Sequence, residues 1–100
     1  MKDSEFFETC AEEIDKGWCQ NKAGYWASET GEVCMVGALI RVTVRADDSN
    51  YAQLDRRRDI IQQRLGVSWI EAWNDTPGRT KEEVYDAFMG LAKKLRNEGE

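Results

Sequence analysis

Apolar side chains recur at helical spacing in three parts of the chain. In the segment from about Glu5 to Lys16 they share one face, and Gly17 follows where a helix would end. A second segment precedes Gly66 and a third follows Thr80, each again with its apolar positions three or four residues apart. In the second segment the residues at this spacing are Tyr51, Leu54, Ile61 and Leu65, with the charged Arg58 on the same face. In the third they are Val84, Phe88, Leu91 and Leu95.

Residues that favour helix starts refine these boundaries. Asp3 or Ser4 is expected to cap the first helix, because a short polar side chain can accept a hydrogen bond from the first turn. Ser68–Glu71 and Thr80–Glu83 both have the form of a capping box, in which Ser or Thr is followed three residues later by Glu. They predict a short helix ending near Trp73 and a final long helix.

The segment 33–44 is apolar on every side, so its periodicity does not distinguish a strand from a helix. Its valines and Thr43 favour a strand, whereas Ala38 and Leu39 favour a helix. We interpret it as a central buried helix. Just before it, residues 24–26 and 32–33 flank a turn at 28–31, which indicates a short β-hairpin.

These elements predict a mainly α fold, a bundle of four to five helices with room for one short β-hairpin near residues 24–33. The chain has 100 residues, of which 41% are apolar and 33% charged, so a single globular domain over 1–100 is expected.

A cytoplasmic location is expected, in a bacterium or an infected host cell. The N-terminus turns acidic at once and has no apolar stretch of the kind that directs export. The longest apolar run, 33–40, is shorter than the roughly 20 residues that span a bilayer, so no membrane partner is expected. Three cysteines are an odd number, which favours reduced thiols.

The composition argues against several functional classes. The net charge is −5 and no basic block is present, so direct nucleic-acid binding is not expected. Histidine is absent, which removes the commonest general base and zinc ligand, and no nucleotide-binding glycine loop is found. We therefore expect no enzyme, no cofactor and no metal. Cys34 would have a lowered pKa at a helix start, although a core role is the simpler interpretation.

Trp73, Asn74 and Asp75 form the most distinctive candidate binding site, with Arg79 close behind in the sequence. Trp69 and Trp73 share a helix face, and the polar pair then enters a turn. One interpretation is a core-anchored turn in which the pair caps backbone groups. The other is an exposed polar pair on an aromatic platform that contacts a protein or a small ligand.

Charged residues supply the remaining candidates. Arg58 falls on the apolar face of its helix, so it should pair with a carboxylate, for which Asp75 is the candidate, or else bind an anion. Glu8, Glu12 and Asp15 on the first helix are either a solvated face or a mimic of phosphates that occupies a basic site on a partner.

Three stretches of the chain carry a family resemblance. Gly17–Gln20, Gly31–Leu39 and Trp73–Val84 contain a Gly-Trp with a nearby Gln, a Gly-x-x-Cys-x-x-Gly-Ala-Leu core and a Trp-Asn-Asp…Arg-Thr-x-Glu-Glu-Val end. In these motifs the chain resembles a family of uncharacterised small proteins from bacteria and bacteriophages. The resemblance implies a helix over 34–39 and no particular activity. The 42–44 tail departs from the family pattern, which leaves the end of that helix open.

The function expected from these observations is that of a small non-enzymatic protein-interaction protein. A bacteriophage protein that acts on a host protein is one form of this hypothesis. The alternative is a small-molecule or nucleotide binder, or an enzyme, that uses the Trp73–Asn74–Asp75 turn. The sequence sets no oligomeric state.

Overall fold

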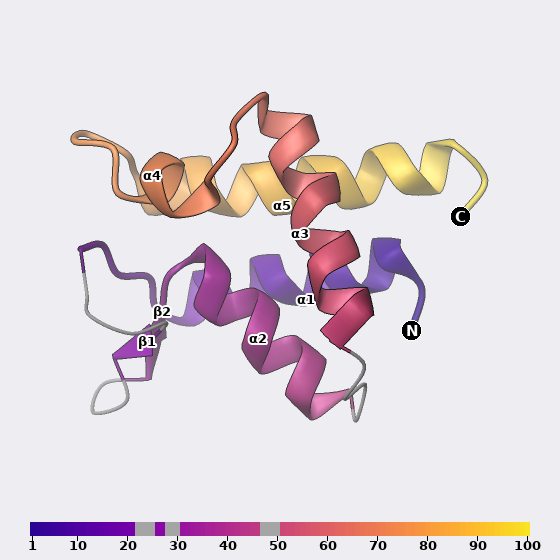
Figure 1. Cartoon of the computed structure of the whole chain (residues 1–100), viewed down its shortest axis with the longest axis horizontal. Helices are drawn as coiled ribbons and strands as arrows, with labels where there is room; N and C mark the ends of the chain where they lie inside the picture. Colours follow the sequence, from indigo (N-terminus) through magenta and orange to yellow (C-terminus); the bar gives the residue numbers. More distant parts are fainter. Residues whose placement is uncertain (22–25, 28–30, 47–50) are drawn as a thin grey trace.

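A computed structural model describes residues 1–21, 26–27, 31–46 and 51–100 of the chain (Figure 1). Within these residues it contains five helices and one pair of two-residue strands, which confirms the mainly α fold. In chain order the elements are α1 Asp3–Lys16, β1 Trp26–Ala27, β2 Glu32–Val33, α2 Met35–Arg45, α3 Tyr51–Leu65, α4 Ile70–Asn74 and α5 Lys81–Asn97. No helix in the described ranges is both long enough and apolar enough to cross a membrane.

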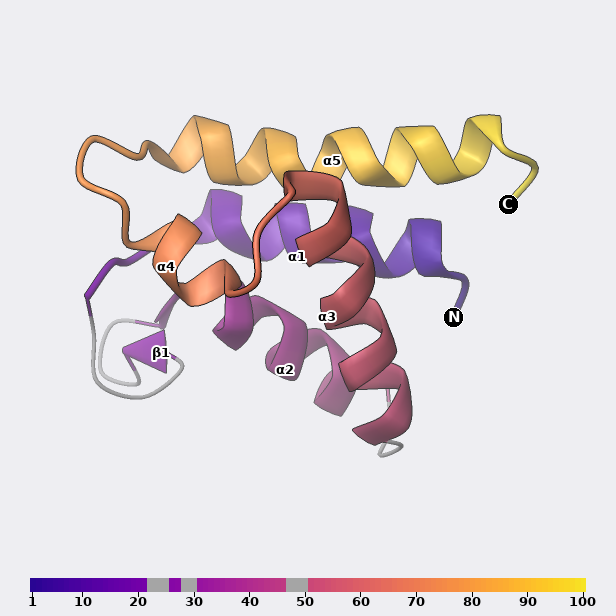
Figure 2. The ribbon, with the colours of Figure 1, turned by 45° about the horizontal axis from the view of Figure 1, so that its top comes forward.

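Helices α1 and α5 lie side by side and run antiparallel, and Figure 2 shows α2 below α1, on the side away from α5. Contacts at both ends establish the direction. The backbone N–H of Ser4 donates to the carboxylate of Glu100 at 2.8 Å, and Lys81 lies 3.9 Å from Asp15 at the opposite end. The two chain termini therefore meet at one end of the molecule.

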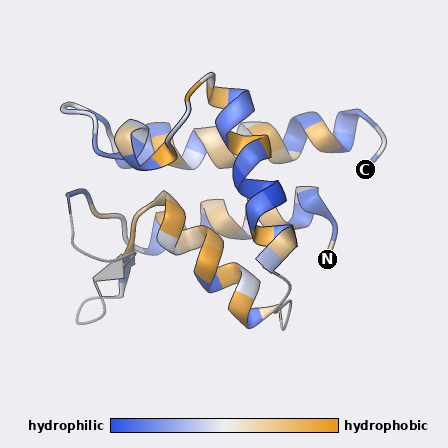
Figure 3. Cartoon of the chain, viewed as in Figure 1, coloured by the Kyte–Doolittle hydropathy of each residue, from blue (hydrophilic) through white to orange (hydrophobic). Residues whose placement is uncertain are grey.

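The core fills the space between α1, α2 and α5. The Phe7 and Phe88 rings stack across the α1–α5 contact with centroids 6.3 Å apart, and both side chains are fully buried. Helix α2 is apolar around most of its circumference, whereas α3 is mostly hydrophilic (Figure 3). Among its residues α3 buries only Arg57 and Ile61, so it lies on the core as a charged cover.

Most of the element predictions are confirmed. Gly17 ends α1, and Gly66 ends α3 with a φ of 69°, a left-handed conformation that glycine adopts without strain. Both hydrogen bonds of the Thr80–Glu83 capping box are present. Segment 33–44 is helical from Met35 to Arg45, so its β-branched tail continues the helix rather than ending it.

Two predicted caps are wrong. Helix α1 begins at Asp3 after Lys2, which makes no side-chain cap bond, and Ser4 is buried within the first turn. The Ser68 capping box does not form either, because Trp69 is the N-cap residue of α4 and makes no such bond. In both places a side chain that is distant in the sequence accepts the backbone hydrogen bond that a cap residue would accept. The carboxylate of Glu100 reaches α1, and the Gln62 amide oxygen accepts the N–H of Ile70 at 3.2 Å.

The hairpin prediction is confirmed for its strands. Trp26 pairs with Val33 and Ala27 pairs with Glu32 in antiparallel register. Residues 24–25 of the first expected strand and residues 28–30 of the expected turn lie outside the described residues. Trp18 forms a parallel bridge with Val33, so the segment that follows α1 runs beside β2.

Candidate functional site

The side chain of Asn74, the last residue of α4, joins three segments that are distant in the sequence. Its exposed fraction is 1%. Oδ1 accepts hydrogen bonds from Nε1 of Trp18 at 2.7 Å and from the backbone N–H of Met35 at 3.2 Å. Nδ2 donates to the carbonyl of Cys19 at 3.2 Å and to Oδ1 of Asp75 at 2.9 Å. These four bonds use both donors and both lone pairs of the amide.

The side-chain amide of Asn74 replaces one backbone hydrogen bond next to the parallel β-bridge between Trp18 and Val33. In that bridge Cys19 N–H donates to the carbonyl of Val33 at 3.1 Å. The next bond of a regular parallel ladder would join the carbonyl of Cys19 to the N–H of Met35. Asn74 lies between these two groups, donating to the first and accepting from the second. Its side chain therefore extends the ladder and closes the start of α2.

The turn after Asn74 is held by further bonds to the 17–21 segment. The side-chain amide of Gln20 donates to the carbonyls of Asn74 and Thr76 at 2.9 and 3.1 Å. The carboxylate of Asp75 accepts the backbone N–H of Asn21 at 3.0 Å. The polar groups that made this turn a candidate binding site are thus engaged within the chain, which favours a structural role.

Arg79 closes the other side of the same turn. Its Nε donates to the carbonyl of Trp73 at 3.0 Å, and its guanidinium lies 3.7 Å from the centre of the Trp73 ring. It also pairs with Glu83 at 3.1 Å on the first turn of α5. Arg79 therefore fixes the turn to the start of α5, and Trp73 is covered by it rather than presented as an open platform.

The predicted pairing of Arg58 with Asp75 is wrong. Arg58 pairs with Glu71 at 2.5 Å, and its guanidinium lies 5.8 Å from the Trp69 ring. The deeply buried arginine is Arg57, with an exposed fraction of 2%. Because Arg57 and Arg58 precede Ile61 by four and three residues, both flank the same apolar line, and helical periodicity does not choose between them.

Arg57 is held at the contact of α3 with α1. Its Nε donates to Asp3 at 3.0 Å, and its guanidinium lies 4.3 Å from the centre of the Phe6 ring. Arg56 pairs with the same carboxylate at 2.7 Å. The hydrogen bond from Arg56 is the main cause that lowers the pKa of Asp3, since it outweighs the opposing effect of burial.

The three acidic candidates on α1 differ in their surroundings. Glu8 forms an ion pair with Arg96, and Asp15 lies beside Lys81, so both face cations on α5. Glu12 is exposed. Two of the three carboxylates therefore join α1 to α5, which leaves less of this face available for imitating phosphates than the sequence suggested.

An acidic residue that sequence reasoning missed is buried nearby. Glu13 has an exposed fraction of 2%, and its carboxylate contacts Lys16 at 2.8 Å, Arg41 at 3.3 Å and Arg45 at 2.7 Å. We call these four residues the Glu13 cluster. Burial alone would raise the pKa of the Glu13 carboxyl, but the three cations outweigh it and bring the pKa below its ordinary value of 4.5. The available signal was the position of Glu13, seven residues after Phe6 on the buried line of α1.

Beside this cluster the outer side of α2 presents apolar groups. We define the α2–α3 face as Val36, Ile40 and Val44 of α2 with Leu54 of α3. Val44 is 71% exposed, Ile40 and Leu54 are half-buried, and Val36 is buried with an exposed fraction of 4%.

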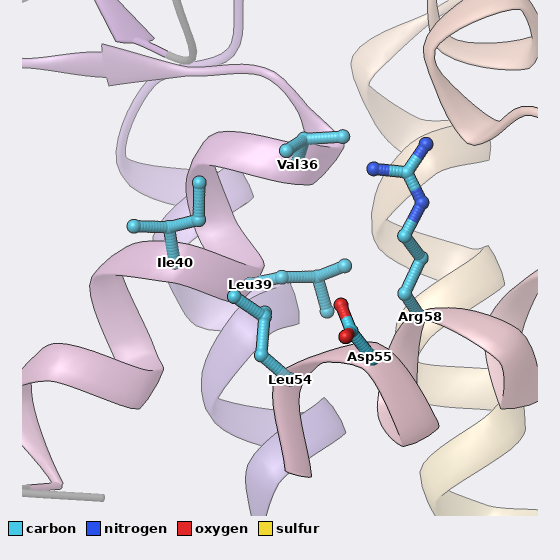
Figure 4. A pocket seen from close by; sticks show the side chains of 6 residues that line it. All are labelled: Val36, Leu39, Ile40, Leu54, Asp55 and Arg58. Atoms are coloured by element: carbon cyan, nitrogen blue, oxygen red, sulfur yellow. The ribbon is translucent and has the colours of Figure 1, made fainter. Parts of the chain in front are cut away.

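Two adjoining hollows mark the α2–α3 face. A groove of about 180 Å³ lies between the two helices, with Val36 and Ile40 on one side and Asp55 and Arg58 on the other (Figure 4). A hollow of about 310 Å³ continues over Ile40 and Val44 to the two arginines of the Glu13 cluster. Because Ile40 lines both, they form one continuous surface. Sequence reasoning missed this surface, because it interpreted the apolar residues of 33–44 as a buried helix.

The lowered thiol pKa considered for Cys34 is wrong. Its Sγ accepts the N–H of Gly37 at 3.4 Å as the N-cap of α2, but burial raises the pKa of this thiol above its ordinary value of 9.0. Burial likewise raises the pKa of Cys10. Among the described residues, no three His, Cys, Asp or Glu side chains gather as they would around a metal ion.

A model of a protein family matches residues 1–94, which include α1 to α4 and most of α5. It describes a family of unknown function, DUF6197. The chain belongs to the DUF6197 family. The resemblance to an uncharacterised family is thereby confirmed. No match was found among curated proteins or among solved structures. Membership of DUF6197 carries no activity with it, so a function has to be argued from the geometry.

The DUF6197 chain is expected to lose stability in acid. The folded-state pKa values of Glu13 and Asp3 lie below their ordinary values of 4.5 and 3.8. Such groups stabilise the fold fully at a pH above those ordinary values, and the contribution is lost as the pH falls through the folded-state pKa. The thermal midpoint should therefore fall between about pH 5 and pH 3. A smaller fall of the thermal midpoint in Glu13→Gln would assign part of the acid sensitivity to Glu13. A midpoint that is unchanged down to about pH 3 would contradict the prediction.

Proposed function

We propose that this DUF6197 chain is a non-enzymatic protein-interaction protein that binds its partner through the α2–α3 face. The observation that carries the proposal is the exposure of apolar side chains there. Val44 is 71% exposed and lines the same hollow as the half-buried Ile40, which also lines the groove between α2 and α3. Exposed apolar groups that adjoin one another are typical of contact surfaces, whereas scattered ones are common on any protein.

The other candidate site, the Trp73–Asn74–Asp75 turn, is less suited to binding a ligand than the α2–α3 face. A binding site needs polar groups that are available to a ligand. Asn74 uses its whole hydrogen-bonding capacity within the chain, and Asp75 accepts from Asn21 and Asn74. The absence of histidine from the chain adds weight against acid–base catalysis. An enzyme or small-molecule binder centred on this turn is therefore the weaker alternative.

The cellular setting belongs to the same proposal. The resemblance to bacterial and bacteriophage proteins supports a bacterium or an infected cell as the setting, and the odd number of cysteines supports the cytoplasm. A bacterial protein is accordingly the partner proposed here.

The proposal is tested with a partner captured from bacterial lysate, then purified and recombined with the chain. Val44→Asp places a charge on the α2–α3 face at a side chain that is 71% exposed, so the fold should tolerate it. We expect the dissociation constant to rise about tenfold or more, because a desolvated carboxylate would oppose an apolar contact.

Asn97→Asp is the matched control, since it adds the same charge at an exposed residue of α5. It should leave the dissociation constant unchanged. Binding that survives Val44→Asp but is lost in a folded Asp75→Ala variant would move the site to the turn and overturn the proposal.

A further inference from the structure

The Glu13 cluster leaves uncompensated positive charge beside the α2–α3 face. Its three cations and one carboxylate sum to a charge of +2. The cluster therefore has the opposite sign to the net charge of −5 that the whole chain carries. A local excess of one sign next to apolar groups selects partners by charge as well as by shape.

Two of these cations reach solvent. The side chains of Arg45 and Lys16 are 58% and 69% exposed, whereas Arg41 is 21% exposed and also donates to the carbonyl of Gly31 at 3.0 Å. The bond from Arg45 to Glu13 comes from Nη1. A guanidinium has five N–H donors in a planar fork, so Arg45 retains donors with which to bind a second carboxylate.

The apolar part of the face has the form of a helix ridge. Ile40 and Val44 lie four residues apart, so the ridge extends about 6 Å along α2, and the buried Val36 lines the groove one turn before them. Leu54 stands opposite across the groove between α2 and α3. Such a groove accepts the apolar side chains of a third helix, and the arginines of the Glu13 cluster would lie along one edge of it.

The charges on the other edge are closer to balance. Arg58 is paired with Glu71, and Asp55 lines the same groove. The edge formed by α2 is therefore the one whose charge would distinguish partners.

From this arrangement we infer that the segment bound by the α2–α3 face is an amphipathic helix whose apolar side chains are bordered by Asp or Glu. The inference rests on the proposed function and specifies the chemistry of its partner. Carboxylates on the bound helix would pair with Arg45, while its apolar side chains cover Ile40 and Val44.

The probes for the test are synthetic peptides of defined composition. One is an 18-residue amphipathic helix of Leu, Ala and Glu, and the second has Lys in place of each Glu. Titration into the ¹⁵N-labelled chain, followed by NMR, gives both the affinity and the location of the contact. The Glu peptide should shift the amides of 36–45 and 54–58 and bind about tenfold more tightly than the Lys peptide, with the difference falling as salt is added. Equal affinities, tighter binding of the Lys peptide, or shifts centred elsewhere would overturn the inference.

Variants then separate this inference from the proposed function. Arg45→Gln should reduce the preference for the Glu peptide at least about threefold, because it removes one exposed cation and keeps the shape of the face. Lys93→Gln removes the same charge from an exposed residue of α5 and should leave the preference intact. If Val44→Asp abolishes binding of the purified natural partner while Arg45→Gln has no effect on any ligand, the proposed function stands and this inference fails. If neither variant affects that partner, both fail.

Discussion

Asn74→Ala is expected to lower the free energy of unfolding by about 3–5 kcal/mol, the largest effect of any single change considered. The substitution removes four hydrogen bonds at once. It leaves the buried N–H of Met35 without the acceptor that it has in Asn74, and a buried group without a partner costs about 1–3 kcal/mol. Urea denaturation followed by circular dichroism measures the loss.

Two further variants make this result specific. Asn74→Asp should also be strongly destabilising, because a carboxylate has no donor for Cys19 and would face the carboxylate of Asp75. Asn97→Ala, at an exposed asparagine of α5, should change stability by less than about 0.5 kcal/mol. If Asn74→Ala lowered the free energy of unfolding no more than Asn97→Ala does, the amide of Asn74 would be available to a ligand. The turn would then again be a candidate binding site.

Glu13→Ala should cost about 3 kcal/mol, the second largest effect. Loss of the carboxylate leaves Lys16, Arg41 and Arg45 close together without their shared counter-charge. The expected cost is at the lower end for a broken buried ion pair, because Lys16 and Arg45 remain accessible to water.

Glu12→Ala is the matched control for this change, since Glu12 is the exposed neighbour on the same helix. Both variants are compared by thermal unfolding at neutral pH. Equal melting temperatures for the two variants would mean that the Glu13 cluster does not stabilise the fold, and the acid sensitivity expected above would need another origin.

The sequence predicted helices well where the signal was local. The spacing of Val84, Phe88 and Leu91 and the Thr80–Glu83 capping box define α5 within a few neighbouring residues, and both features are present. The 33–44 segment also formed the expected helix, although its β-branched residues favoured a strand. Burial against α1 outweighs that preference, because propensity is weak compared with the packing of an apolar helix.

The parts that sequence reasoning missed depend on partners distant in the chain. The residues near Glu13 in the sequence do not indicate that it pairs with Arg41 and Arg45. Likewise, the residues near Asn74 do not indicate that its amide bonds to the backbone of Cys19 and Met35. The sequence singled out the motif around Asn74 as distinctive, but a distinctive polar residue can be required for folding as well as for binding. The α2–α3 face was missed because an apolar residue at a helix surface has the same sequence pattern as one in the core.

Amide hydrogen exchange of the chain, alone and with its purified partner, is the decisive test of whether this DUF6197 chain binds a protein through the α2–α3 face. Binding there should slow exchange in 35–45 and 51–58 and leave the 73–80 turn unchanged. Slower exchange confined to the 73–80 turn or to α1, with α2 unchanged, would contradict it.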